Sequence, residues 1–196
     1  MVEELLRGIG LDESVEPVCV AFTNTVGERH GSGHSEHFES PAHLQRWLVG
    51  HRLLGACPDL DGDYLRRALD LREAIYRILS AIGAMRPPDP GDIEVVNAEL
   101  AEAMGRIEVA DSLKWTLAAE DPRERALMII ALSAAALMTS PLSDRIRECA
   151  NETCGWLFID HSKNRSRRWC SMSDCGNLAK ARRFSQRRRN AKSGNR

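Results

Sequence analysis

Apolar residues recur at helical spacing through most of the chain before residue 140. The clearest stretch is Asp61–Met85, where apolar side chains return every three or four positions and only Arg72 interrupts them. A shorter helix is predicted to begin at Ser40-Pro41, with Ser40 as the capping residue, and to end at Gly50. This spacing predicts a helical fold for the amino-terminal part of the chain.

Two further helices are predicted before residue 140. The first is Asp92–Gly105, and the proline-rich segment Arg86–Gly91 is expected to be the linker in front of it. Its expected inward-facing residues are Ile93, Val96, Leu100 and Met104. The segment Asp121–Glu124 has the residue order of a capping box, and the helix that follows is apolar on nearly every side as far as Thr139. We therefore place this last helix at the centre of the amino-terminal bundle.

Short β elements are predicted at three places. Val18–Phe22 has the composition of a strand, Asn24–Glu39 that of a loop or irregular hairpin, and Ile107–Leu117 alternates weakly, as a small hairpin does. Ser140-Pro141 marks the boundary of this part of the chain. The expected fold is mainly α with small β elements, in which an α-rich amino-terminal domain precedes a small carboxy-terminal module.

The net charge of −1 hides an uneven distribution of charge along the chain. Residues 145–196 carry 14 Lys and Arg against 4 Asp and Glu, whereas residues 1–144 carry 13 against 24. Such a split indicates two modules with different partners, and a strongly basic module is typical of nucleic-acid binding.

No targeting or membrane-spanning segment is predicted. Met1–Gly10 is acidic and amphipathic, without the basic and apolar regions of a signal peptide. The longest apolar run, Ala126–Met138, has 13 residues, fewer than the ~20 that span a bilayer. We expect a cytoplasmic protein without a membrane partner, in which thiols stay reduced and favour metal binding over disulfides.

Four of the six cysteines lie within 27 positions and form two close pairs. They are Cys149, Cys154, Cys170 and Cys175, in the pattern Cys-x4-Cys, fifteen residues, Cys-x4-Cys. Two close pairs separated by a hairpin-length segment are how proteins assemble a tetrahedral zinc site. The sequence therefore predicts one structural Zn²⁺ ion, and four protein ligands leave no open position for catalysis.

Other interpretations of the cysteines are weaker. Two disulfides or four idle thiols conflict with a reducing compartment. His161 is an alternative fourth ligand, although the four cysteines already suffice. Cys19 and Cys57 are interpreted as a strand residue and a loop residue with no role.

The segments around the cysteine pairs predict a small zinc-bound fold. Trp156–Ile159 and Ser166–Trp169 are expected to be two strands joined by a turn at His161–Arg165, and a helix should cover Leu178–Arg189. A knuckle, a hairpin, a second knuckle and a helix make a treble-clef-like finger with a basic carboxy-terminal helix. The aromatic residues Trp156, Phe158, Trp169 and Phe184 are expected to form a core around the metal.

Basic residues gather on the predicted turn and the final helix. The candidate nucleic-acid contacts are Lys163, Arg165, Arg167, Arg168, Asn177, Lys180, Arg182, Arg183 and Arg187. A helix this basic would release counterions from a duplex, and arginine reads guanine edges in the major groove. The alternative is a solvated face, but such faces mix charges of both signs and this one does not. DNA and RNA are not separated by this pattern.

The cysteine module resembles the CGNR zinc finger. The resemblance rests on Cys149-x4-Cys154, on Asp160–Met172, whose Arg165–Met172 part is the most specific, and on Cys175-Gly176-Asn177. It implies zinc binding by the four cysteines and DNA binding by the finger. The motif that names the family ends in Arg, whereas this chain has Leu178. If that arginine contacts a phosphate or a base, this chain lacks one contact. If it instead buttresses the finger, Leu178 should pack against the finger.

The amino-terminal part resembles the ABATE domain, which is named for stress-induced transcription regulation. The residues that carry this resemblance are Phe22–Thr25, Leu44–Leu48 and Leu69–Ala74. The implied organisation is an ABATE-like domain at residues 1–141 for ligand sensing or dimerisation, a finger at 142–190 and a disordered basic tail at 191–196. The expected function is that of a bacterial DNA-binding transcriptional regulator, acting as a homodimer on double-stranded DNA.

The sequence also allows other functions. The same zinc module could serve as an RNA-binding or protein-interaction adaptor. A metal enzyme would need a cluster such as His30, His34 and His37, but these residues lack the fixed spacing of a metal pair and we expect no enzyme. A small effector in the amino-terminal domain could meet Arg29 and Arg72, unless each of them forms an ion pair.

Overall fold

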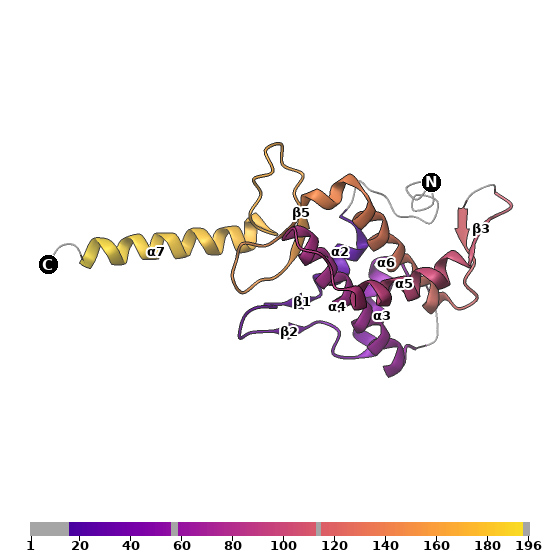
Figure 1. Cartoon of the computed structure of the whole chain (residues 1–196). Coiled ribbons are helices and arrows are strands. Elements are labelled where there is room, and N and C mark those ends of the chain that lie inside the picture. Colours follow the sequence, from indigo (N-terminus) through magenta and orange to yellow (C-terminus); the bar gives the residue numbers. More distant parts are fainter. Residues whose placement is uncertain (1–15, 56–58, 113–114, 194–196) are drawn as a thin grey trace.

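The computed structural model describes residues 16–55, 59–112 and 115–193, with the backbone alone after Gln186. The helices packed at one end form the helical part, from α2 (Val18–Thr23) to α6 (Pro122–Thr139), and the segments from η1 (Pro141–Arg145) to α7 (Asn177–Ser193) form the finger (Figure 1). Cys57 and the last three residues of the predicted basic tail lie outside the described residues. The prediction of a mainly α fold with small β elements and a carboxy-terminal zinc module is confirmed.

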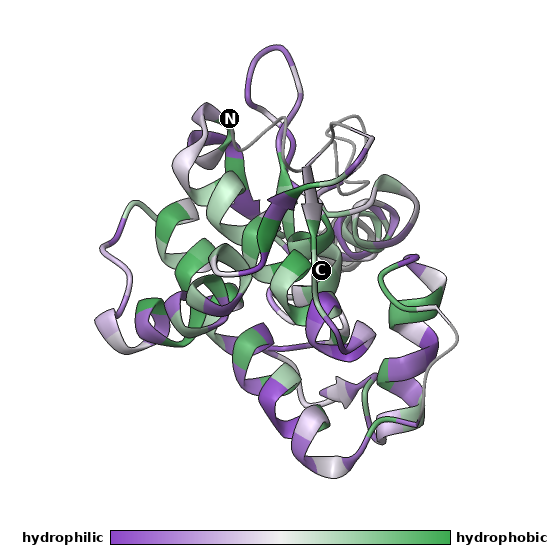
Figure 2. Cartoon of the chain, turned by 90° about the vertical axis from the view of Figure 1, so that its right-hand side faces the viewer, coloured by the Kyte–Doolittle hydropathy of each residue, from purple (hydrophilic) through white to green (hydrophobic). Residues whose placement is uncertain are grey.

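Five α-helices build the described residues of the helical part. They are α2 (Val18–Thr23), α3 (Pro41–Gly50), α4 (Gly62–Gly83), α5 (Pro90–Met104) and α6 (Pro122–Thr139). Helix α4 packs against the other four, so it forms the centre together with α6. Apolar residues gather where these helices face one another, and the outer turns are hydrophilic (Figure 2).

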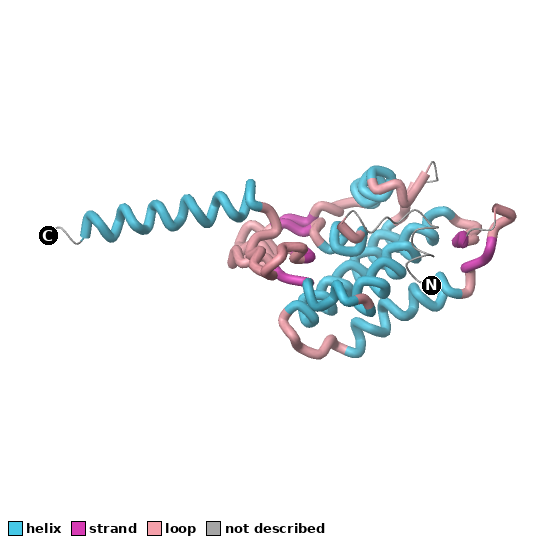
Figure 3. The backbone as a smooth tube through the Cα atoms, turned by 90° about the horizontal axis from the view of Figure 1, so that it is seen from above, coloured by secondary structure: helices cyan, strands magenta, loops and turns pink. Residues whose placement is uncertain are grey.

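The finger begins with the 3-10 helix η1 (Pro141–Arg145) and the strands β5 (Ile146–Glu148) and β6 (Leu157–Ile159). The π-helix η2 (Met172–Gly176) then leads into α7 (Asn177–Ser193). Helix α7 extends away from the packed helices in both views that show its length (Figures 1 and 3). Among the described elements it packs closely only against η2.

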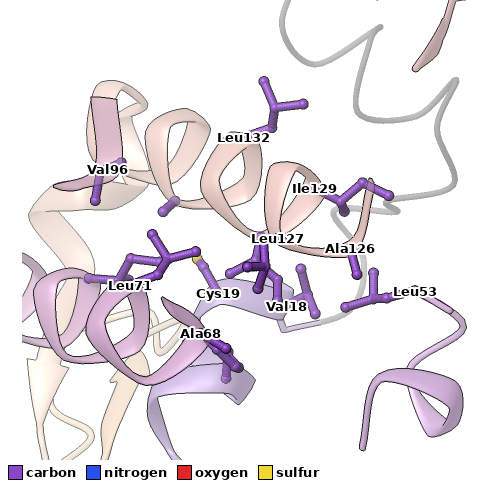
Figure 4. Packing of buried hydrophobic residues seen from close by; sticks show 14 of the residues in the cluster. Val18, Cys19, Leu53, Ala68, Leu71, Val96, Ala126, Leu127, Ile129 and Leu132 are labelled. Atoms are coloured by element: carbon purple, nitrogen blue, oxygen red, sulfur yellow. The ribbon is translucent and has the colours of Figure 1, made fainter. Parts of the chain in front are cut away.

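Helix α6 is buried along almost its whole length, as its apolar sequence predicts. Leu127, Ile129 and Ile130 are at most 1% exposed, and α2 lies between α6 and α4 (Figure 4). Each such side chain contributes about 1.5–3 kcal/mol relative to an exposed position. The same cluster includes Ile146, Leu157 and Ile159, so the strands of the finger share the hydrophobic core of the helical part.

The predicted strand at Val18–Phe22 is wrong, because this segment forms helix α2. Val18, Cys19, Val20 and Phe22 are all buried. A helix meets its backbone hydrogen bonds within the segment, whereas a strand buried between α4 and α6 would have had no partner strand. Packing on several sides therefore overrides the β propensity of the valines. Cys19 is a buried helix residue, and burial raises the pKa of its thiol to about 12.

The predicted starts of α3, α4 and α6 agree with the structure, although the side chain of Ser40 makes no capping hydrogen bond to α3, and α5 begins earlier than predicted. The side chains of Asp61 and Asp121 accept hydrogen bonds from the backbone of the first helical turn. Asp89 does the same for Gly91, so α5 begins at Pro90, inside the predicted linker. The capping box of α6 is only half formed, since Glu124 accepts a hydrogen bond from Arg67 of α4 at 2.6 Å.

The expected inner face of α5 is partly wrong. Val96 is buried, but Ile93 and Met104 are 39% and 61% exposed. The buried positions include Asp92 and Glu99 instead. These two carboxylates pair with Arg77 and Arg67 of α4, so the contact between α4 and α5 is held by ion pairs as well as by apolar packing.

Arg72, the single charge on the apolar face of α4, lies in a buried ion network. Its guanidinium donates to Glu36 at 2.6 Å, to Glu73 at 2.9 Å and to the hydroxyl of Thr25. Although burial opposes it, the hydrogen bonds and charges of Arg72 and Arg29 hold the pKa values of Glu36 and Glu73 below their usual range. A charge can stay in this core because each of the three guanidinium nitrogen atoms donates at least one hydrogen bond.

Three small antiparallel pairs complete the fold of the described residues. Strands β1 (Val26–Gly27) and β2 (Ser35–Glu36) confirm the irregular hairpin, and β3 (Ile107–Val109) and β4 (Trp115–Leu117) confirm the second one. In the finger, β6 pairs with β5, so the predicted pairing with a strand at Ser166–Trp169 is wrong. The backbone of that segment instead bonds to the first cysteine knuckle, where Ala150 donates to the carbonyl of Arg168 at 2.8 Å.

Within the described ranges, no helix has the length and hydropathy needed to cross a membrane.

Candidate metal centre and nucleic-acid interface

The first cysteine pair lies in the connection between β5 and β6. Cys149 donates its backbone N–H to Trp156 at 2.8 Å, and Cys154 donates to Asn151 at 2.9 Å, which closes a tight knuckle. Gly155 follows with φ of 72°, a left-handed conformation that favours glycine. A Cβ atom at Gly155 would lie 2.7 Å from the Cβ of Arg29, so the knuckle also needs glycine to pack against the helical part.

The second pair lies at the start of the carboxy-terminal helices. Ser171 caps η2 through a hydrogen bond from the backbone N–H of Asp174, and Cys175 lies within η2. The short π-helix turns the chain so that the sulfur of Cys175 approaches that of Cys170, at 3.8 Å. Helix α7 therefore starts directly at the cysteine site.

The four sulfur atoms form one compact group. All of them lie within 4.8 Å of one another, and those of Cys154 and Cys170 are 3.7 Å apart. Four thiolates at about 2.3 Å from a tetrahedral zinc ion are about 3.8 Å apart, whereas a disulfide needs about 2.05 Å. The donor set and the spacing thus fit one structural Zn²⁺ ion bound by Cys149, Cys154, Cys170 and Cys175.

The thiols already influence one another electrostatically. A hydrogen bond from Cys170, with further ones from the Trp156 backbone and from Cys175, lowers the pKa of Cys154 to about 5 despite burial. The pKa of Cys170 is raised by the same contact, and burial raises that of Cys175 to about 11. One thiolate is thus stabilised before the others ionise, and metal binding has to release the remaining protons.

Within the described ranges, these four cysteines are the only group of three or more His, Cys, Asp or Glu side chains that could hold a metal. Nε2 of His30 lies 2.8 Å from Glu148, and Glu36 is paired with Arg72. His161 is not part of the group. Arg29 pairs with Glu73 and Arg72 pairs with Glu36, so the two arginines form ion pairs and not an anion-binding pocket for an effector.

Asp160 closes the basic loop between the two cysteine pairs. Its side chain is fully buried and accepts the backbone N–H groups of Ser162 at 2.8 Å and Arg167 at 3.0 Å. Hydrogen bonds, first of all from Ser162, hold the pKa of this carboxyl below its usual range. The carboxylate thus ties together the two ends of the loop, whose residues 163–166 are exposed.

Five of the nine candidate nucleic-acid contacts are exposed basic side chains without an ion-pair partner among the described residues. They are Lys163, Arg165, Arg168, Lys180 and Arg183. Three lie on or next to the loop that Asp160 closes, and two lie in the first turns of α7. Arg168 lies over the ring of Trp169, with its guanidinium carbon 5.4 Å from the ring centroid.

The other four candidates differ from these. Arg167 donates to the carbonyl groups of Trp169 and Cys170 and stacks on Phe158, so its guanidinium supports the second knuckle. Arg182 donates to Asn151 at 3.1 Å. Asn177 donates to the Ser173 carbonyl at 2.9 Å, which ties α7 to η2. Arg187 belongs to the part of α7 where only the backbone is described.

Two apolar residues of the last helix face outward. Leu178 is 44% exposed, so it does not pack into the finger as a buttress would. Phe184 is 63% exposed, and its expected place in a core around the metal is therefore wrong. Phe158 is buried as expected, whereas Trp156 and Trp169 are half-buried. Only Phe158 of the four aromatic residues is thus buried beside the metal. The apolar residues of the finger strands pack instead into the core of the helical part.

The finger is joined to the helical part by backbone and side-chain bonds next to the first knuckle. The amide of Asn24 both donates to and accepts from the backbone of Leu157, at 2.9 Å each. The backbone N–H of Arg29 donates to the carbonyl of Cys154 at 3.1 Å, and the indole of Trp156 donates to Val26 at 2.7 Å. These bonds fix the metal centre against α2 and β1.

Two residues of this site were missed by the sequence reasoning. Asn151 donates to the sulfur of Cys175 at 3.4 Å, and Asp160 organises the basic loop. The signal for Asn151 was its position inside the first knuckle. The signal for Asp160 was an acidic residue directly before a basic loop, where a carboxylate typically accepts backbone N–H groups two residues on.

Two family models match the chain. The ABATE model, described as "Putative stress-induced transcription regulator", matches residues 16–141, and the CGNR zinc finger model matches residues 145–188. No curated protein matches the chain in sequence. The two matches support a zinc-finger regulator, and they agree with the cysteine group found in the structure.

Proposed function

Because the chain belongs to the ABATE family and carries a CGNR zinc finger, we propose that it is a bacterial transcription regulator whose finger binds double-stranded DNA. The observation that carries the proposal is the set of exposed basic side chains beside the metal centre, which form no ion pair with a described residue. Cations left without carboxylate partners can neutralise phosphates without first breaking an internal contact.

The shape of the finger supports a duplex as the partner. Helix α7 stands clear of the packed helices, and the major groove of DNA is about 12 Å wide, close to the diameter of a helix with its side chains. Among the described elements α7 packs closely only against η2, so most of its length lacks the tertiary packing that stabilises helices in proteins. A bound duplex would therefore both accept α7 and stabilise it. The loop with Lys163 and Arg165 would contact the phosphate backbone beside the groove.

A binding titration tests this proposal. Fluorescence anisotropy of the zinc-loaded protein with labelled duplex DNA, repeated from 50 to 300 mM salt, should give an affinity that falls steeply with salt, as about four or five phosphate contacts require. The Cys170→Ser variant should lose binding. The proposal fails if the duplex does not bind near 100 mM salt, or if folded RNA outcompetes duplex DNA, which would favour the RNA-binding adaptor.

We assign no catalytic step to the chain. A zinc ion with four thiolate ligands keeps no position open for water or substrate. The proposal places the protein in the cytoplasm, where reduced thiols stay available to the metal. It also takes a homodimer as the binding unit, since regulators that recognise two-fold operators commonly bind as dimers. Light scattering of the free protein tests the dimer, and a monomer at micromolar concentration would contradict it.

We also propose a small effector for the helical part. A hollow of about 300 Å³ lies where α2 and α3 meet the finger. It is lined by Glu16, Ala21, Asn24, Thr25, His37, Trp47, Trp156, Leu157 and Cys170. Its wall is mainly apolar, with a few polar groups, as in small-molecule sites.

Ligand-detected NMR with indole, benzoate and benzyltrimethylammonium tests this effector site, with Trp47→Ala as the control variant. The mainly apolar wall and the carboxyl group favour the neutral or the cationic ring. Binding of none of the three, or binding that Trp47→Ala leaves unchanged, would contradict the site.

A further inference from the structure

Asn151 links the metal centre to helix α7. Its amide nitrogen lies 3.4 Å from the sulfur of Cys175, and its amide oxygen accepts a hydrogen bond from Arg182 at 3.1 Å. Asn151 is buried, with 9% of its surface exposed, and lies in the first knuckle, whereas Cys175 and Arg182 belong to η2 and α7. The contact therefore joins the two halves of the cysteine site from outside the ring of sulfur atoms.

The chemistry of the three groups allows only one orientation of the amide. A guanidinium has donors and no acceptor, and a metal-bound thiolate has no proton to donate. The oxygen of Asn151 must face Arg182, and its NH₂ group must face the sulfur. Arg182 thus holds the amide in the orientation in which it can donate to the thiolate.

The link also matters electrostatically. Four thiolates around a zinc dication leave a net charge of −2, so a hydrogen bond to a sulfur atom and a nearby cation both stabilise the metal-bound state. Cys149 and Cys154 are buried, but Cys175 is half-buried and would otherwise share its charge mainly with water. Arg182 is the basic side chain that a described hydrogen bond connects, through Asn151, to a sulfur atom.

We propose that Asn151 and Arg182 are positioning residues of the zinc site, and that Arg182 serves the metal and the direction of α7 rather than nucleic acid. Arg182 acts through Asn151, which fixes the half-buried sulfur and ties α7 to the first knuckle. This inference concerns the zinc site and stands whether or not the finger binds DNA.

The first measurement is the rate of zinc transfer from the full-length protein to a colorimetric chelator. The Asn151→Asp substitution keeps the shape of the side chain but removes its donor and adds a negative charge beside the thiolates. We expect transfer to become about 10–100-fold faster, the range in which residues outside the ligand set affect metal affinity. Arg182→Ala should accelerate transfer several-fold, whereas Arg183→Ala, the neighbouring exposed cation, should not.

The second measurement separates positioning from general loss of structure. If Arg182 acts through Asn151, Arg182→Ala should have no further effect on zinc transfer when Asn151 is already Ala. In the cobalt-substituted protein, Asn151→Ala should shift the sulfur-to-metal charge-transfer band to lower energy, because the thiolate loses its hydrogen bond. Arg182→Lys keeps the positive charge and should restore part of the slow transfer.

The inference is overturned if Asn151→Asp releases zinc at the wild-type rate, or if Arg182→Ala and Arg183→Ala behave alike. Additive effects of Asn151→Ala and Arg182→Ala would also overturn the action through Asn151. Loss of DNA binding with unchanged zinc transfer in Arg182→Ala would instead make Arg182 a nucleic-acid contact. If the wild-type protein binds no DNA at all, the proposed function fails while the zinc-transfer results still decide this inference.

Discussion

Arginine has different surroundings in the two regions of this protein. In the helical part, Arg29, Arg67, Arg72 and Arg77 form ion pairs with carboxylates, two of which, Asp92 and Glu99, are buried. In the finger, among the side chains that the structure describes, no Lys or Arg pairs with a carboxylate. Its arginines either donate to backbone carbonyls and an amide, or lie in solvent.

This difference shows where binding capacity lies. Charges that already have partners stabilise the fold and are not available to a ligand, whereas unpaired cations repel one another until an anion arrives. The helical part uses charge to join α4 to its neighbours, and the finger gathers positive charge around a metal site. The two regions nevertheless share one apolar core through Ile146, Leu157 and Ile159.

The largest difference between the two regions is expected when a cysteine is replaced by serine in each of them. Cys154→Ser removes a zinc ligand, and we expect loss of the metal, loss of nucleic-acid binding and a lower unfolding temperature of the whole chain. Metal binding supplies about 10–16 kcal/mol in small zinc folds. Cys19→Ser changes a buried thiol of α2 and should cost about 1–3 kcal/mol without loss of zinc. Metal analysis and calorimetry of both variants check this; equal zinc contents would contradict it.

Arg72→Ala tests the buried ion network of the helical part. Glu36 would lose its ion-pair partner and Glu73 one of its two, beside a guanidinium that is almost fully buried, so the free energy of unfolding should fall by about 3 kcal/mol. The control is Arg66→Ala, whose side chain is 67% exposed and should contribute about 0–1 kcal/mol. Urea unfolding followed by circular dichroism measures both. Similar losses for the two variants would show that Arg72 is not structural.

The same network predicts a pH dependence. The folded-state pKa values of Glu36 and Glu73 lie below the ordinary value of 4.5, so their stabilisation is present above that pH and is lost as pH falls through the lower folded values. Urea unfolding of metal-free protein at pH 6 and pH 3.5 should show a larger loss for the wild type than for Glu36→Gln. Metal-free samples keep acid release of zinc out of the comparison, and equal losses would contradict the prediction.

Leu178→Arg adds one cation to the finger and should have the smallest effect of these substitutions. Leu178 is exposed in the first turn of α7, so an arginine there adds a cation without disturbing the core. We expect a few-fold tighter binding to duplex DNA and a salt slope steeper by about 1. Leu178→Gln serves as the uncharged control. A tighter complex with both substitutions would point to removal of the exposed apolar side chain rather than to charge.

Periodicity and spacing predicted most of this structure. The long apolar repeat gave α4, the Asp-Pro signals gave α6, and the four cysteines gave the metal site. The strand predicted at Val18–Phe22 is wrong because a short run of valines fits a strand or a buried helix equally well. Packing between α4 and α6 determines that this segment is a helix.

The local sequence pattern also could not predict that β6 pairs with β5, because the pairing depends on which segment the first cysteine knuckle places next to β6. Composition could not separate the roles of the basic residues either. Arg167 and Arg168 are neighbours in sequence, yet one supports a knuckle and the other faces solvent. Such roles follow from the positions of carbonyl groups in three dimensions, which residue counts do not contain.

The most direct test of the central claim is the salt dependence of DNA binding for two matched triple variants of the zinc-loaded protein. One replaces Arg168, Lys180 and Arg183 by Gln in the finger, and the other replaces Arg52, Arg66 and Arg86 by Gln in the helical part. If the unpaired cations of the finger bind phosphates, the first variant should lose about 3 from the slope of log affinity against log salt, and the second should keep the wild-type slope. Equal slopes for the two variants, or a wild-type affinity that does not change with salt, would contradict the account.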